Sequence, residues 1–210
     1  RDVLGRGLLG DITGERSRVD KVVFNNFEMQ EVLVVYPDST SFKQIEIIEG
    51  RNGSLDEEVT MRFNWVLDYK NNKFYFQRND FFYKPFNFNM SGIEVQHSGI
   101  QFVKEEVEYS SSNFKISFEK NDENFNFSQN YRYELKPVFD IYAIRKNSPA
   151  DKAGIKVGDV LKKINGLSSY NLSIQKITDI FQSEDGKQIT IVVDRKGQIL
   201  TFKFKLEKIL

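Results

Sequence analysis

The chain has 210 residues, enough for one large domain or two small ones, and its 30 Lys and Arg residues balance its 30 Asp and Glu residues. A formal net charge of zero gives no electrostatic case for nucleic acid or an anionic membrane as a partner, because both require clustered cations. Cysteine is absent, His97 is the single histidine and no apolar run approaches the ~20 residues that span a bilayer, so we expect no disulfide, metal, cofactor or transmembrane segment.

Residues 1–79 have the pattern of β-strands joined by turns. Apolar residues flank the dipeptide Asn25-Asn26, which favours a turn. Val32–Tyr36 is a short apolar run of the kind that forms a buried strand.

A short helix followed by a hairpin is predicted farther along this segment. Apolar side chains recur every four residues from Leu55 to Phe63, which indicates one face of a helix over Glu57–Phe63. The apolar runs 65–67 and 74–76 then surround an Asn-rich turn, a pattern typical of a β-hairpin.

This first segment resembles a bacterial retropepsin-like aspartyl protease domain. Gly50–Phe76, with its glycine turn, helix and hairpin, is similar to the C-terminal part of that domain, and Gly7–Asp11 and Val32–Asp38 are similar to its middle. The resemblance implies residues 1–79 to be the C-terminal portion of such a domain, the alternative being an unrelated small β domain.

The catalytic turn of such enzymes is not found in this sequence. The family uses two aspartates that share a proton and activate water, each in an Asp-Thr/Ser-Gly turn. Asp11 has one extra residue before Thr13-Gly14, and Asp38-Ser39-Thr40 lacks the glycine. We therefore expect no catalytic residue here, and the aspartate-bearing portion to lie upstream of Arg1.

The middle of the chain combines an aromatic stretch with alternating strands. Residues 81–88 are too aromatic for a solvated linker, so we expect them to pack at a domain junction. Phe114–Glu119 and Phe125–Leu135 alternate apolar and polar residues around the polar turn 121–124, which predicts a hairpin.

Asn147–Gly166 reads as one compact unit. Ser148 is a predicted N-cap with Pro149 at the first helical position, and Gly154 is placed to end the short helix in a left-handed conformation. Val160–Ile164 follows as a strand.

The remaining residues predict a second helix and a closing hairpin. Ile174–Phe181 has the spacing of an amphipathic helix, with Asn171 or Ser173 as its cap. Strands at 188–193 and 199–206 follow, the second with inward Leu200, Phe202, Phe204 and Leu206.

Four short motifs resemble a PDZ domain, in particular those attached to bacterial proteases. They are Ser148-Pro149-Ala150, Ala153-Gly154, Gly158-Asp159-Val160-Leu161 and Ile164-Asn165-Gly166. The resemblance implies a partly open β-barrel with two helices over residues 80–210, interrupted by an inserted β-hairpin around 99–137. It also implies an exported, periplasmic protein.

The resemblance further implies a peptide-binding site. Backbone N–H groups of the loop hold a peptide's terminal carboxylate, while the strand that follows pairs with the peptide as an added β-strand. The loop and strand positions are Ser91, Gly92, Ile93, Glu94 and Val95. The candidates on the second helix are Ile174, Ile177 and Phe181, of which one or two must face the core.

We therefore interpret the chain as mainly β with short helices (α+β), a β-rich aspartyl-protease-like half-domain followed by a PDZ domain. The leading function is capture of peptide or protein C-termini by strand addition, for substrate recognition or regulation in a parent aspartic endopeptidase whose upstream half is a partner. One alternative is that the chain itself cleaves peptides, as a dimer. The other is a structural interaction module whose groove is blocked by its own hairpin.

Overall fold

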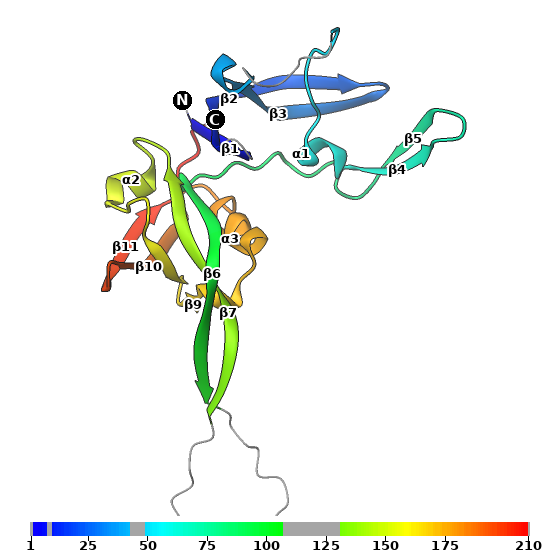
Figure 1. The fold of residues 1–210 in the computed structure, drawn as a ribbon. Helices are drawn as coiled ribbons and strands as arrows, with labels where there is room; N and C mark the ends of the chain where they lie inside the picture. Colours follow the sequence, from blue (N-terminus) through cyan, green and yellow to red (C-terminus); the bar gives the residue numbers. More distant parts are fainter. Residues whose placement is uncertain (1, 8–9, 43–48, 107–130, 210) are drawn as a thin grey trace, which may run out of the picture.

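The computed structural model describes residues 2–7, 10–42, 49–106 and 131–209. Within these ranges the strands form three sheets, and the helices are short (Figure 1). In chain order the elements are β1 (Asp2–Gly7), β2 (Gly10–Phe24), β3 (Phe27–Pro37), η1 (Ser39–Phe42), α1 (Glu57–Thr60), β4 (Phe63–Asp68), β5 (Lys73–Arg78), β6 (Ile93–Glu106), β7 (Tyr131–Ile144), α2 (Pro149–Ala153), β8 (Val160–Ile164), β9 (Leu167–Ser168), η2 (Ser169–Asn171), α3 (Ile174–Phe181), β10 (Gln188–Arg195) and β11 (Gln198–Lys205).

The first sheet is an antiparallel meander in the order β1-β2-β3. The predicted turn at Asn25 is confirmed, since this residue adopts a positive φ of 52° between β2 and β3. The predicted buried strand is only half right. Val32 is buried, but Val35 and Tyr36 are exposed.

The predicted helix over Glu57–Phe63 is too long. Asp56 caps α1 by accepting a hydrogen bond from the Glu58 N–H, and the helix ends after one turn at Thr60. Phe63 is instead the first residue of β4, and it reaches the core from a strand. The hairpin β4–β5 is confirmed, with its turn where the Asn-rich sequence predicted it.

Aromatic rings form the core of the first part of the chain. Their centroids lie 4.9–6.2 Å apart in tilted and edge-to-face pairs. The rings belong to Phe24, Phe27, Phe63, Trp65, Phe76 and Phe82. Phe82 and Phe86 pack in this cluster, whereas Phe88 packs in the second core, so the aromatic stretch 81–88 is divided between the two.

The second sheet has the order β11-β10-β8-β7-β6, with β9 on β8. Its core is mainly aliphatic and is covered by α2 and α3. The predicted caps are confirmed, because Ser148 accepts from the Asp151 N–H and Gly154 is left-handed with φ 90°. Of the two caps considered for α3, Ser173 is the one used.

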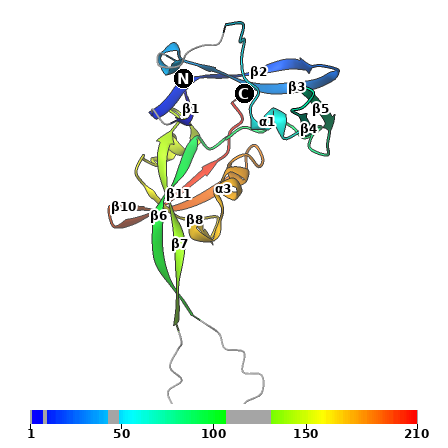
Figure 2. The same cartoon turned by 45° about the vertical axis from the view of Figure 1, so that its right-hand side comes forward.

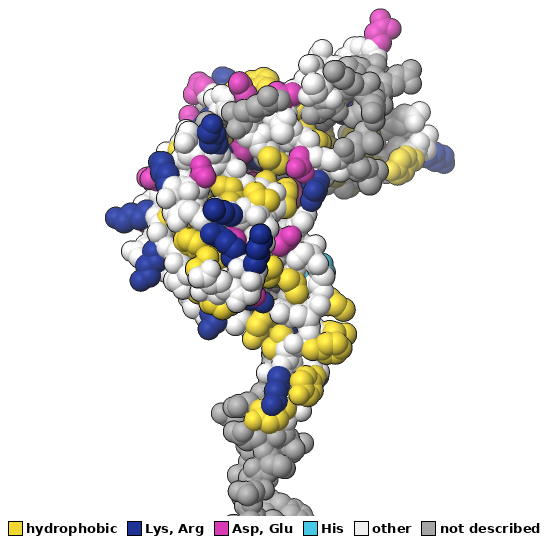
Figure 3. Space-filling view, turned by 60° about the vertical axis from the view of Figure 1, so that its left-hand side comes forward, with side chains coloured by type: hydrophobic (Ala, Val, Ile, Leu, Met, Phe, Trp, Pro, Cys, Tyr) yellow, Lys and Arg dark blue, Asp and Glu magenta, His cyan; other side chains and the backbone are white. Residues whose placement is uncertain are grey.

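β6 and β7 are paired from Ile93–Ile144 to Glu106–Tyr131, with register shifts between Glu94 and Val95 and between His97 and Gly99. The extra length expected around 99–137 therefore prolongs two strands of the sheet, and Figure 2 shows them as a projecting ribbon. The alternation predicted over 114–127 lies outside the described residues. The projecting ribbon carries exposed apolar side chains at Ile100, Phe102, Tyr133 and Leu135. Figure 3 shows hydrophobic side chains gathered along this part of the surface.

Candidate functional site

β6 is the outer strand of the second sheet. One of its edges pairs with β7, and among the described residues the other edge has no strand partner; α3 lies beside β6. Val95 lies opposite Ile141, whose N–H and C=O bond to Asp159 and Gly158 on the far side. In an antiparallel pair without mutual hydrogen bonds, the N–H and C=O groups of each residue point away from the partner strand. The Val95 N–H and C=O therefore point to the free edge of β6.

The loop that precedes β6 is buried and tightly packed. Gly92 has φ 80°, and a Cβ added there would lie 2.2 Å from the Ser148 Cβ. Its C=O accepts a 2.8 Å hydrogen bond from the Arg145 N–H, and the Ser91 C=O accepts one of 3.2 Å from the Ala150 N–H. Only glycine fits this position, because both the φ and the space exclude a side chain.

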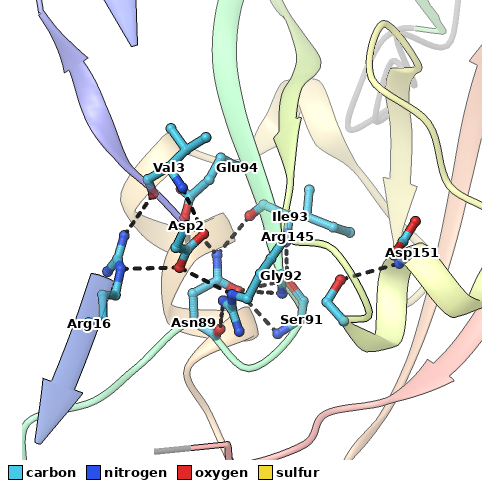
Figure 4. A network of polar contacts seen from close by, with 11 residues as sticks. Asp2, Val3, Arg16, Asn89, Ser91, Gly92, Ile93, Glu94, Arg145 and Asp151 are labelled. Atoms are coloured by element: carbon cyan, nitrogen blue, oxygen red, sulfur yellow. Dashed lines mark hydrogen bonds and ion pairs between the residues drawn. The ribbon is translucent and has the colours of Figure 1, made fainter. Parts of the chain in front are cut away.

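The loop N–H groups are already hydrogen-bonded inside the protein (Figure 4). The Ser91 and Gly92 N–H groups donate to Asn89 Oδ1 at 3.1 and 3.2 Å, and the Ile93 N–H donates to Ser91 Oγ at 3.0 Å. Asn89 Nδ2 donates to the Ile93 C=O at 2.7 Å. The Ser91 and Gly92 N–H groups therefore share an acceptor on a side chain of the same chain, and the Ile93 N–H bonds to a different side chain.

A network of charges joins the loop to the first sheet. Arg145 Nε lies 3.2 Å and Arg16 Nε 3.3 Å from Asp2 Oδ2, and Arg145 Nη2 donates to the Asn89 C=O at 2.7 Å (Figure 4). Both guanidinium groups also lie over the Phe88 ring. Burial lowers the pKa of Arg145, while Asp2 opposes that shift. Sequence reasoning missed this network because its members are far apart in the chain.

Glu94 and Val95 face opposite sides of β6. Val95 packs against the second core, whereas Glu94 faces the charged network. Burial raises the pKa of Glu94, the neighbouring Asp2 adds to the rise, and Arg16 and Arg145 oppose it.

Two of the three predicted peptide-contacting residues on α3 lie in the core. Ile177 is 0 % and Phe181 1 % exposed, whereas Ile174, in the first turn, is 41 % exposed. The spacing of three and four residues places Ile177 and Phe181 on the stripe that faces the sheet. The backbone of α3 also reaches the loop, since the Phe181 C=O accepts from the Met90 N–H at 3.0 Å.

Other polar residues singled out by the sequence have structural partners. Asp11 forms an ion pair with Arg6 at 3.1 Å, and Asp38 Oδ2 accepts from Thr13 Oγ1 at 2.6 Å. The His97 ring is exposed and lies 6.0 Å from that of Phe139. Within the ranges that the structure describes, no cluster of three or more metal-ligand residues occurs, and no helix is long and apolar enough to cross a membrane.

Comparison with protein families identifies a PDZ domain at residues 141–195. Two similar proteins are probable CtpA-like serine proteases from Staphylococcus saprophyticus (36% identity) and Staphylococcus aureus strain COL (33%). Each match covers 64 residues, or 30% of this chain and 13% of the relative, so the chain spans only a small part of these proteins.

Two solved structures are also similar to part of the chain. They are the HtrA-type protease AlgW with a decapeptide and its S227A form with a decapeptide, at 22% and 21% identity. Each covers 33% of this chain and 21% of the solved chain, with a TM-score of 0.30. The CtpA-like relatives are described as serine proteases, so they give no support to the aspartyl protease resemblance of residues 1–79.

Proposed function

We propose that this chain is a peptide-binding module that adds an extended polypeptide segment to the free edge of β6. The observation that carries the proposal is the outward-pointing Val95 backbone on an outer strand beside α3, within a PDZ-containing chain. An added strand gains main-chain hydrogen bonds there, and side chains along α3 such as Ile174 supply apolar contact.

The C-terminal end of a peptide added to β6 is proposed to lie beside the loop that precedes this strand. The Ser91 and Gly92 N–H groups converge there on one acceptor, and the Ile93 N–H donates to Ser91 Oγ. A terminal carboxylate is a stronger acceptor than a neutral amide oxygen, but it has to displace Asn89 Oδ1 first.

We further propose that the module serves substrate recognition or regulation within a larger, exported protease, with the upstream protease half as its partner. The protease association is supported by the CtpA-like and HtrA-type relatives. An aspartic parent is a separate candidate, favoured by the order of Gly50–Phe76, in which α1 is followed directly by the hairpin β4–β5. The serine chemistry of the relatives is not carried over, because the match covers 13% of their length.

The edge of β6 is tested by removing one outward N–H. We expect Val95→Pro to weaken binding of peptides selected from a random decapeptide array at least tenfold, while the β6–β7 ladder is kept. The matched control Val95→Ala removes the side chain and retains the N–H, and should bind as the native chain does. Equal binding by Val95→Pro, with circular dichroism showing both variants folded, or no binding of any arrayed decapeptide to the native chain would contradict the proposal.

A further inference from the structure

The Asn89 carboxamide makes both kinds of hydrogen bond that the last residue of an added peptide would make. A terminal carboxylate would accept from the loop N–H groups, and Asn89 Oδ1 accepts from Ser91 and Gly92. The last N–H of an antiparallel peptide would donate to an outward C=O at the start of β6. Asn89 Nδ2 donates to that group, the Ile93 C=O, at 2.7 Å.

The Ile93 C=O is an outward group by the same reasoning as for Val95. The Arg145 N–H, next to the residue opposite Ile93, bonds to Gly92, so Ile93 and Ile144 form a pair without mutual hydrogen bonds. Both the N–H and the C=O of Ile93 therefore point away from β7, and both have partners, in Ser91 and Asn89.

Asn89 is held in this position from several directions. Its side chain also accepts a 2.7 Å hydrogen bond from Ser91 Oγ, and its C=O accepts from Arg145. Asn89 is 7 % exposed and Ser91 is fully buried, so the bonds are shielded from water. Breaking any of these buried bonds would leave an unpaired polar group, so together they hold the Asn89 side chain in place.

The surrounding charges do not favour a second anion. Two guanidinium groups, of Arg16 and Arg145, face two carboxyl groups, of Asp2 and Glu94. Each of these cations already has a carboxylate neighbour, which weakens its attraction for the carboxylate of a peptide.

We infer that Asn89 is an internal occupant of the carboxylate position, so that peptides bind to β6 without requiring a free C-terminus. The inference rests on the proposed function and specifies its ligand class, which is extended segments recognised by strand addition alone. Peptides with a free acid and with an amidated C-terminus should then bind equally well.

The test uses one decapeptide from the array, synthesised as free acid and as C-terminal amide, with both dissociation constants measured by calorimetry. For the native chain we expect the two to agree within about twofold. In Asn89→Ala the Ser91 and Gly92 N–H groups become available, and the free acid should bind at least tenfold more tightly than the amide. Asn89→Asp keeps an acceptor there but adds a negative charge, so it should show no such preference.

A tenfold preference of the native chain for the free acid, or a folded Asn89→Ala that shows none, would overturn the inference. Hydrogen exchange gives a readout that needs no peptide. The Ser91 and Gly92 amides should exchange at least tenfold more slowly in the native chain than in Asn89→Ala. Equal exchange rates in the two chains would contradict internal occupancy, whether or not a peptide bound. The absence of peptide binding would by itself count only against the proposed function.

Discussion

Two irregular segments of this protein are each organised by one buried polar side chain. Arg62 fixes the segment 81–85 by donating to the carbonyl groups of Phe81, Phe82, Lys84 and Pro85. Asn89 fixes the loop before β6 mainly by accepting from N–H groups. The difference is that loop N–H groups are donors of the kind that an anionic ligand needs, whereas the carbonyl groups around Arg62 are acceptors and would repel an anion. The first arrangement is structural, whereas the second occupies groups that an anionic ligand would otherwise bind.

Removing the guanidinium of Arg62 should have the largest effect. Arg62→Met keeps the aliphatic stem but leaves several carbonyl groups without donors and removes the cation 3.6 Å from the Phe86 ring centroid. We expect a loss of about 3 kcal/mol in the free energy of unfolding, measured by urea denaturation.

A suitable control is Arg78→Met, because Arg78 bonds to the exposed Tyr83 hydroxyl in the same part of the chain. Its effect should stay within about 0.5 kcal/mol. Similar losses in the two variants would show that Arg62 contributes no more than a surface arginine does.

Asp2→Asn tests whether the first sheet stabilises the loop. The substitution keeps the shape but removes the charge that both Arg16 and Arg145 face, and we expect a loss of about 1 kcal/mol together with faster exchange of the Gly92 amide. Asp11→Asn breaks an exposed pair on the same sheet and should change neither quantity measurably. An unchanged Gly92 exchange rate in Asp2→Asn would show that the first sheet does not stabilise the loop.

The elements predicted best from the sequence are those set by local backbone chemistry. Ser148, Pro149 and Gly154 specify α2 through capping and a left-handed residue, and the structure reproduces each. The helix predicted to reach Phe63 was too long because the recurrence of apolar residues also arises when a strand sends a ring into the same core.

For the loop before β6, the sequence predicted the turn but not the partner of its N–H groups. Gly92 indicated where N–H groups converge, because only glycine permits that turn. That Asn89 fills the position could not be inferred, since an Asn three residues before a glycine is common in exposed turns. Likewise the burial of Ile177 and Phe181 depends on the rotation of α3 against the sheet, which the helical period alone does not fix.

The smallest predicted effect concerns Glu94. Burial raises the pKa of Glu94 in the folded chain, so ionisation of this carboxyl group disfavours the folded state. The free energy of unfolding therefore falls as the pH rises from the unfolded pKa of about 4.3 through the folded pKa. Glu94→Gln should therefore increase stability at pH 7, by less than about 1 kcal/mol, and leave it unchanged near pH 3. Glu134→Gln should act in the opposite direction at pH 7, because the hydrogen bond from Lys136 lowers the pKa of Glu134. Thermal unfolding of both variants between pH 3 and pH 7 measures whether each substitution raises or lowers stability. A Glu94→Gln variant less stable than the native chain at pH 7 would show that the Glu94 carboxylate is instead needed to balance Arg16 and Arg145.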